Sequence, residues 1–155
     1  MHAIPTAVLA PVAGLAVAMG DVPDPVFAQA LVGPGMAIDP PRAAGVRVVA
    51  PVTGTIVKLH PHAFVLQSDE GRTVLVHLGI DTVRLRGEGF ELFVAEGDHV
   101  EAGQHVVTWD PAAVAAGGRS PVCPVVALEA LPEAIALLVE PGDPVTAGEP
   151  FLRWG

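Results

Sequence analysis

The sequence has one cysteine, Cys123, and only 8 lysine and arginine residues against 17 acidic residues, which gives a formal net charge of −9. A single cysteine cannot close a disulfide within the chain, and we interpret Cys123 as a small buried side chain. The scarcity of basic residues argues against binding to nucleic acid or to an anionic membrane surface, because both require a basic footprint. An acidic chain favours a basic protein partner instead.

The sequence also lacks a segment typical of a signal peptide or a membrane-spanning helix. The stretch from Ile4 to Gly20 is apolar, but Pro5 and Pro11 interrupt any helix, and it is short for a membrane span. No basic residue precedes it, as a signal peptide would require. We therefore expect a cytoplasmic protein without a stable membrane anchor, in which this stretch forms a lead-in and a first buried strand.

Glycine and proline are abundant, with 17 and 16 residues, and they separate short valine-rich runs. Such runs, bounded by turn residues and without helical periodicity, predict an all-β fold. The segment from Pro111 predicts a short helical turn. The length suits a single domain, residues 1–155, with its core in about residues 10–154. The predicted strands are Val46–Val49, Gly54–Leu59, Ala63–Gln67, Thr73–Leu78, Val83–Leu85, Val106–Trp109, Val122–Leu128 and Pro150–Trp154.

Two motifs occur twice. The pattern A-P-V-x-G begins at Ala10 and at Ala50, and the pattern G-D-x-V-x-A-G begins at Gly97 and at Gly142. An early pair and a late pair indicate a duplicated β-motif within one domain rather than a uniform array. Biotinyl and lipoyl carrier domains use similar turns, but they need a lysine at an exposed turn. The only lysine here, Lys58, lies inside a predicted strand, which argues against a carrier.

Three of the six histidines lie in HPHAFVLQSDEGRTVLVHLGID, which starts at His60. If SDEG is the turn of a hairpin, the numbering places His62 opposite His77, with Cβ atoms about 5 Å apart. Two imidazoles on one apolar face are suited to metal ligation or to phosphoryl chemistry, and a chance surface pair is the third alternative. The spacing alone leaves these three alternatives open.

A zinc site is the first alternative to weigh. His60 and His62 form H-x-H, and His77 and Asp81 form H-x-x-x-D, which resemble the ligands of lysostaphin-like zinc peptidases. In that family the two pieces come in the opposite order, and no other residue here is well placed as a third ligand. A zinc peptidase is therefore only a minor alternative.

Five segments carry a resemblance to a known family: VPDPVFAQALVGPGMAIDP, VVAPVTGTI, HAFVLQSDEG, VLVHLGIDTVRLRGEGF and the segment that starts at Gly97. Through them the sequence resembles the enzyme IIA component of the glucose-type phosphoenolpyruvate:sugar phosphotransferase system, from about residue 10 to residue 154. The resemblance implies an antiparallel β-sandwich built from a duplicated hybrid motif, and a phosphotransferase activity that passes through a phosphohistidine. A regulatory protein-binding module of the same fold is a further alternative.

The resemblance also implies a role for His77, Gly79 and His62. His77 accepts a phosphoryl group on Nε2 from HPr and passes it to a cysteine in the IIB domain of a glucose-type or N-acetylglucosamine-type permease. The backbone carbonyl of Gly79 fixes the other ring nitrogen of His77. His62 is the accessory residue that hydrogen-bonds the phosphoryl group. No cofactor is implied, apart from an adventitious or interface zinc ion at His62 and His77, and we expect a monomer.

Other positions flank this pair in the resemblance. Asp24 and Asp81 match acidic positions beside the site, and His60 stands where the family often has a hydroxyl residue that orients the accessory histidine. The orientation of His62 therefore depends on what His60 does. The apolar rim on which partners dock is implied to comprise Phe27, Leu31, Val32, Leu75 and Leu78.

Overall fold

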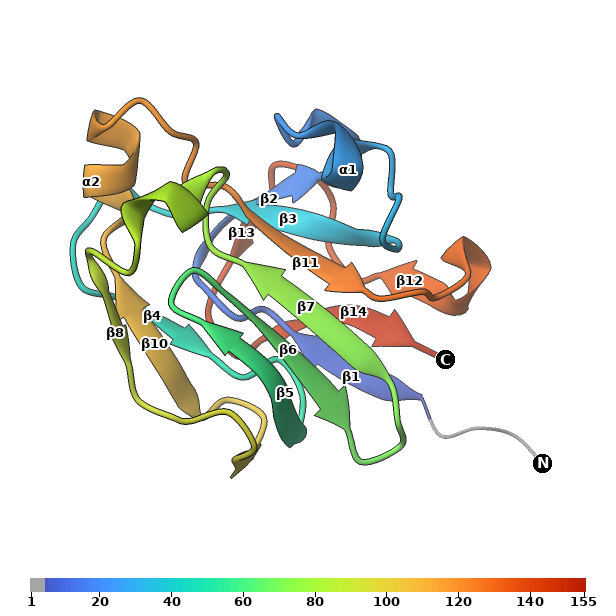
Figure 1. Ribbon diagram of the computed structural model, residues 1–155. Helices are drawn as coiled ribbons and strands as arrows, with labels where there is room; N and C mark the ends of the chain where they lie inside the picture. The colour runs from blue at the N-terminus through green and yellow to red at the C-terminus, as the bar shows by residue number, and fades with distance from the viewer. Residues whose placement is uncertain (1–4) are drawn as a thin grey trace.

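The structure is a computed structural model that describes residues 5–155, and its regular secondary structure is mainly antiparallel β-sheet with a few short helices (Figure 1). The largest sheet runs in the order β13 (Pro144–Val145), β2 (Gly14–Ala18), β3 (Gly35–Asp39), β11 (Cys123–Ala127), β7 (Thr73–His77), β6 (Ala63–Ser68), β5 (Gly54–His60) and β9 (His99–Val100). Two three-stranded sheets complete the fold. One contains β1 (Thr6–Leu9), β14 (Pro150–Trp154) and β12 (Ile135–Leu137). The other contains β4 (Val46–Val49), β10 (His105–Trp109) and β8 (Phe90–Leu92).

The helices are short, as predicted. They are α1 (Pro25–Ala28), α2 (Pro111–Ala116) and the 3-10 turns η1 (Met19–Asp21), η2 (Thr82–Leu85) and η3 (Pro132–Ala134). Asp110 caps α2 by accepting a hydrogen bond from the Ala113 amide at 3.0 Å, and proline occupies the first helical position. None of the helices within residues 5–155 combines the length and the apolar character needed to cross a membrane.

The all-β prediction is confirmed, and seven of the eight predicted strands are found with ends shifted by at most one residue. The eighth, Val83–Leu85, is wrong, because this segment lies in η2. Its two flanking residues, Asp81 and Arg86, have left-handed backbones with φ of 60° and 52°, which turn the chain away from the strand ladder. The predicted lead-in from Ile4 begins outside the described residues, and its remainder forms two strands, β1 and β2, instead of one.

The internal repeat appears in the structure as matched backbone hydrogen bonds. The amide of Leu9 donates to the carbonyl of Pro51, and the amide of Val49 donates to the carbonyl of Pro11, both at 2.8 Å. The two A-P-V-x-G segments therefore cross each other symmetrically. Each G-D-x-V-x-A-G segment pairs with the strand that follows one of them, β13 with β2 and β9 with β5. This arrangement confirms a duplicated motif whose two copies interlock.

Alternating burial within the strands produces two apolar clusters. The main core lies between the sheets and includes Val74 and Val76 of β7, which have no exposed surface. A smaller cluster covers the other face of the large sheet under α1, where Phe27 packs near Ala37 and Val126 (Figure 1). Residues with odd numbers in β7 point toward this second face, and the last of them is His77.

Candidate functional site

His77 is the last residue of β7, and its partly buried ring uses Nδ1 in a hydrogen bond while Nε2 remains available. Its Nδ1 lies 2.6 Å from the carbonyl oxygen of Gly79. Because a carbonyl can only accept, Nδ1 carries the proton, and Nε2 of the neutral ring keeps its lone pair. The predicted role of the Gly79 carbonyl matches this geometry. Nε2 is therefore the nitrogen that is prepared to act as a nucleophile.

The turn after His77 has a backbone that only glycine fits well. Gly79 has φ of 78°, and an added Cβ would lie 2.6 Å from Cγ2 of Thr82 and 3.1 Å from the carbonyl oxygen of Ser120. The next residue, Ile80, donates its amide to that Ser120 carbonyl at 2.9 Å. The carbonyl of Gly79 is consequently held against the segment that leads into β11.

His62 lies close to His77, but the two residues are not the cross-strand pair that the sequence predicts. The β6–β7 ladder pairs His77 with Ala63, so the prediction that His62 stands directly opposite is wrong by one residue. The hairpin loop is longer than SDEG, since the amide of Ser68 donates to the carbonyl of Arg72 and Gly71 adopts a left-handed φ of 89°. The ladder is therefore centred on Glu70 and not between Asp69 and Glu70.

The two rings nevertheless meet. His62 lies in the turn before β6, where strand alternation no longer dictates its direction, and its carbonyl accepts the Leu78 amide at 2.7 Å. The ring centroids of His62 and His77 are 5.2 Å apart, and the ring planes are inclined by 72°. The inferred proximity of the two imidazoles is therefore present, but a turn produces it and not a cross-strand pair.

His60 stands beside His62 on the solvent side. Its side chain is exposed, and the two rings stack with centroids 5.6 Å apart and an interplanar angle of 27°. Burial is the main cause that lowers the pKa of His62 from 6.5 to about 4, and the positive charges that His77 and His60 can carry lower it further. At neutral pH the His62 ring is therefore uncharged.

Two carboxylates lie near His77. Asp24 caps α1 by accepting hydrogen bonds from the amides of Val26 at 2.9 Å and Phe27 at 3.4 Å. Asp81 is exposed, and its left-handed backbone leads into η2 without a hydrogen bond from its side chain to the helix. Burial lowers the pKa of His77, whereas the Gly79 hydrogen bond and then Asp24 and Asp81 raise it, so the net direction is downward.

The predicted docking residues divide into two groups. Leu31 is 67% exposed, and Val32 and Leu75 are partly exposed on the same face. Leu78 is completely buried in the main core, so its assignment to the docking rim is wrong, because β7 has ended and the chain turns inward there. Phe27 is only 8% exposed and serves mainly as packing beside the site, with its ring centroid 5.4 Å from that of His77.

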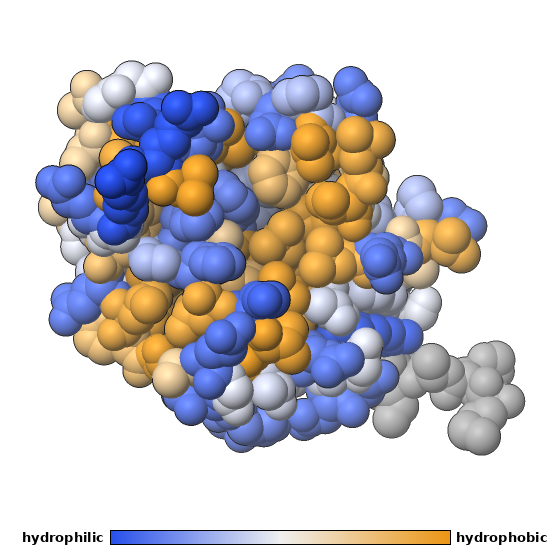
Figure 2. Space-filling view, in the orientation of Figure 1, coloured by the Kyte–Doolittle hydropathy of each residue, from blue (hydrophilic) through white to orange (hydrophobic). Residues whose placement is uncertain are grey.

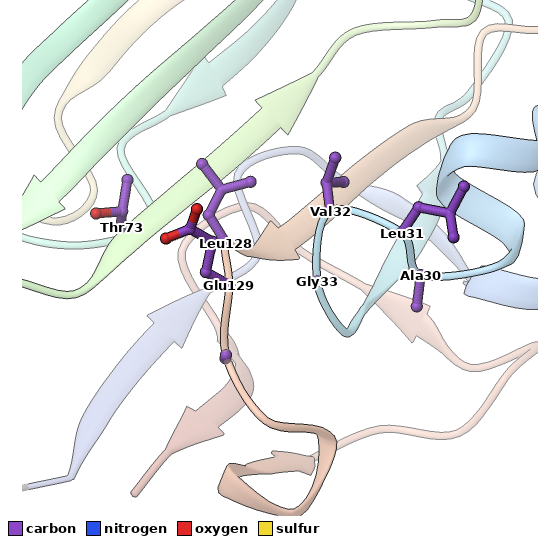
Figure 3. Close-up of a pocket in the computed structure, with 8 residues that line it drawn as sticks. Ala30, Leu31, Val32, Gly33, Thr73, Leu128 and Glu129 are labelled. Carbon is purple, nitrogen blue, oxygen red and sulfur yellow. The ribbon is translucent and has the colours of Figure 1, made fainter.

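The exposed part of this face continues away from the histidines. Figure 2 shows apolar side chains extending from the loop after α1 toward β7 and β11. At the far end a pocket of about 510 Å³ opens between that loop and the turn after β11. Figure 3 shows Leu31 and Val32 on one side of this pocket and Thr73 and Leu128 on the other.

Two further features complete the description of the site. Within residues 5–155 no group of three or more His, Cys, Asp or Glu side chains is arranged to hold a metal ion. Thr82, which is not among the predicted site residues, is fully buried and donates its hydroxyl to the Leu78 carbonyl at 2.7 Å. The available signal was a threonine four residues after the carbonyl that it binds, directly beyond a glycine turn.

Comparison with known proteins identifies the family. The family model for the phosphoenolpyruvate-dependent sugar phosphotransferase system, EIIA 1, matches residues 6–131. The chain is 44% identical over 121 residues to the glucose-specific EIIA component of Halalkalibacterium halodurans, a match that covers 77% of this chain and 68% of that protein. It is 39% identical over 122 residues to the glucose-specific EIIA component of Staphylococcus aureus (strain N315), covering 77% of this chain and 72% of that protein.

Two further comparisons extend this result. The chain is 42% identical over 132 residues to the N-acetylglucosamine-specific EIICBA component of Escherichia coli, which covers 81% of this chain but spans only 20% of that longer protein. The structure of glucose permease IIA from Mycoplasma capricolum superposes with a TM-score of 0.86 at 33% identity, over 99% of this chain and 97% of that chain. The chain therefore belongs to the EIIA 1 family of the phosphoenolpyruvate-dependent sugar phosphotransferase system, whose members are phosphotransferase components that carry phosphoryl groups between proteins.

Proposed function

We propose that this chain accepts a phosphoryl group from HPr on Nε2 of His77 and passes it to a cysteine of a IIB domain. The observation that carries the proposal is the 2.6 Å contact between Nδ1 of His77 and the Gly79 carbonyl. It leaves Nε2 as the only ring nitrogen with an available lone pair. Membership of the family supports HPr and a IIB domain as the two partners.

The chemistry requires little more than positioning. The Nε2 lone pair forms the new N–P bond while the bond between phosphorus and the donor histidine of HPr breaks, and the electron pair of the broken bond stays on the donor ring. In the second step the cysteine thiolate forms a P–S bond, and the His77 ring leaves with the electron pair of the N–P bond. Such transfers depend on alignment and charge stabilisation, which fixed protein groups provide.

His62 is placed to assist both steps. Its ring lies edge-on to His77, so an N–H of His62 can donate to an oxygen of a phosphoryl group on Nε2. The low pKa of His62, about 4, makes it a neutral donor at cytoplasmic pH. A neutral donor stabilises charge during transfer without holding the phosphoryl group in a strong ion pair, which favours onward movement.

The exposed apolar face beside the site is the proposed docking surface for both partners. Leu31, Val32 and Leu75 offer apolar contact, and Asp24 near His77 offers negative charge to a basic partner residue. We further propose that the chain acts as a cytoplasmic monomer in the uptake of glucose or N-acetylglucosamine. Relatives named for both sugars support this choice, and the membrane component sets which sugar is used.

One experiment tests the proposal directly. The chain is incubated with phosphoenolpyruvate, enzyme I and HPr, and the acid-labile phosphoryl adduct is measured for wild type, His77→Ala and His99→Ala. The exposed His99, whose ring lies beside Asp69 far from the site, is the matched control. We expect labelling of wild type and His99→Ala and none of His77→Ala. Full labelling of His77→Ala would refute the assignment.

The same assay separates the role of His62. For His62→Gln we expect acceptance from HPr to continue, because His77 keeps its nucleophilic nitrogen. Onward transfer to a IIB domain should slow by about a hundredfold, the scale at which a positioned hydrogen-bond donor contributes to catalysis. Equal onward rates for His62→Gln and wild type would remove His62 from the mechanism.

A further inference from the structure

Thr82 is a polar side chain sealed beneath the site. It has no exposed surface, and its hydroxyl donates to the carbonyl oxygen of Leu78 at 2.7 Å. Its methyl group occupies the space next to Gly79, 2.6 Å from where a Cβ of residue 79 would lie. Both ends of the Thr82 side chain therefore act on the turn that follows His77.

The carbonyl that Thr82 holds belongs to the peptide unit between Leu78 and Gly79. Because a peptide unit is planar, fixing its oxygen also fixes the amide of Gly79. Gly79 is the residue most able to rotate, since glycine adopts left-handed and right-handed conformations with similar ease. The restraint from Thr82 is thus applied at the point where the turn has the most freedom.

Other contacts hold the two sides of the same turn. The Leu78 amide donates to the His62 carbonyl at 2.7 Å, and the Ile80 amide donates to the Ser120 carbonyl at 2.9 Å. The buried thiol of Cys123 lies near the Gly79 backbone, whose hydrogen bonding partly offsets the burial that raises the pKa of this thiol. Thr82 supplies the remaining restraint, on the Leu78 carbonyl between these anchors.

We propose that Thr82 is a positioning residue that keeps the Gly79 carbonyl aimed at Nδ1 of His77 and thereby selects the nitrogen of His77 that reacts. The Gly79 carbonyl keeps the proton on Nδ1 because it can only accept a hydrogen bond. The direction of this carbonyl depends on the turn from Leu78 to Thr82, which the hydrogen bond from the Thr82 hydroxyl to the Leu78 carbonyl stabilises. The consequence for phosphoryl transfer rests on the proposed function, whereas the consequence for the ring tautomer does not.

The test uses three variants of the full chain. Thr82→Val keeps the shape and removes the hydroxyl donor, and Thr82→Ser keeps the donor and removes the methyl. Thr6→Val is the matched control, because Thr6 is also buried and donates its hydroxyl to Glu70, at the loop end of the β6–β7 hairpin. The ring nitrogens of His77 are observed by nuclear magnetic resonance, which distinguishes a protonated nitrogen from an unprotonated one.

We expect the proton to reside on Nδ1 of His77 in wild type, Thr82→Ser and Thr6→Val, and to be shared between Nδ1 and Nε2 in Thr82→Val. The pKa of His77 should fall in Thr82→Val, because the Gly79 hydrogen bond that raises it is weakened. An unchanged tautomer and an unchanged pKa in Thr82→Val would overturn the proposal. If Thr82→Val does not fold, Thr82→Ala, which leaves room for water at the Leu78 carbonyl, provides the same comparison.

The transfer assay adds an independent measurement. We expect acceptance from HPr to slow by about tenfold in Thr82→Val and to recover in Thr82→Ser, the effect of losing one hydrogen bond that orients a reacting group. A rate loss in Thr82→Val without a tautomer change would assign Thr82 to stability alone and overturn the proposal. Failure of wild type to become phosphorylated would reject the proposed function, while the tautomer comparison would still decide the role of Thr82.

Discussion

His62 meets His77 edge-on, with ring centroids 5.2 Å apart, although the strand ladder pairs His77 with Ala63. The contact depends on the turn before β6, in which the His62 carbonyl accepts a hydrogen bond from the Leu78 amide. Leu78 directly follows His77, and its amide donates to the His62 carbonyl while its own carbonyl accepts the hydroxyl of Thr82. The positions of both rings therefore depend on the backbone hydrogen bonds of one buried residue, Leu78.

Replacing His60 should change the titration of its neighbour. For His60→Ser we expect the pKa of His62 to rise above about 4 yet stay below 6.5, because the charge of His60 is removed while burial and His77 still act. His60→Phe keeps a stacked ring without a charge and should give the same rise. Proton resonance titration of His62 checks both variants. If the pKa of His62 rises in His60→Ser but not in His60→Phe, the stacked ring at position 60, and not its charge, lowers the pKa of His62.

Stability should depend on pH through His62. Its pKa is about 4 in the folded chain and 6.5 when unperturbed, so between these values the unfolded chain binds a proton that the folded chain does not. The free energy of unfolding should therefore be highest above pH 6.5 and fall as the pH drops toward 4. In His62→Gln this contribution is absent, and the decline should be shallower. Urea denaturation at several pH values measures it, and parallel declines would contradict the prediction.

A methyl group at Gly79 should destabilise the chain. Gly79→Ala combines a left-handed φ of 78° with a Cβ 2.6 Å from Thr82, and we expect a loss of about 3 kcal/mol in the free energy of unfolding. Gly71→Ala is the control, since Gly71 has φ of 89° but open space around the added Cβ. It should lose only about 1 kcal/mol. Equal losses, measured by urea denaturation, would show that the contact with Thr82 is unimportant.

A charge on the docking surface should weaken the encounter with HPr. For Leu31→Lys we expect KM for phospho-HPr to rise by about tenfold with little change in kcat, because a positive charge replaces an exposed apolar contact and repels a basic partner. Leu137→Lys, at a 52% exposed leucine of β12, should leave KM unchanged. Steady-state transfer assays separate these outcomes, and equal KM values for both variants would place the docking surface elsewhere.

The strands and the histidine pair were accessible from the sequence because both are local patterns. Short apolar runs bounded by glycine or proline predict β4 and β14 to the residue. The register of β6 and β7 could not be predicted from the sequence, because it depends on the length of the loop between them. With Gly71 in a left-handed conformation, the loop is one residue longer than predicted. A shift of one residue normally reverses every side chain, and His62 escaped this only by lying outside the strand.

The errors at the site have one physical origin. Alternation predicts direction only while a strand lasts, and β7 ends at His77. The next residues turn through the left-handed Gly79, so Leu78 enters the core and not the predicted surface, and Thr82 becomes a buried donor to the Leu78 carbonyl. The short run that ends at Leu85 predicts a strand for the same reason, because its residue pattern does not indicate the left-handed turns at Asp81 and Arg86.

The pairing of β1 with β14 has a consequence for how the chain is made. Thr6 lies opposite Trp154, so the first described strand acquires its neighbour only after the last described strand has been synthesised (Figure 1). During synthesis the edge of β1 stays unpaired, while the β6–β7 hairpin with His62 and His77 can already close. The His62–His77 pair can thus form from contacts within one hairpin, whereas the sheet of β1, β14 and β12 requires strands from both ends of the described chain.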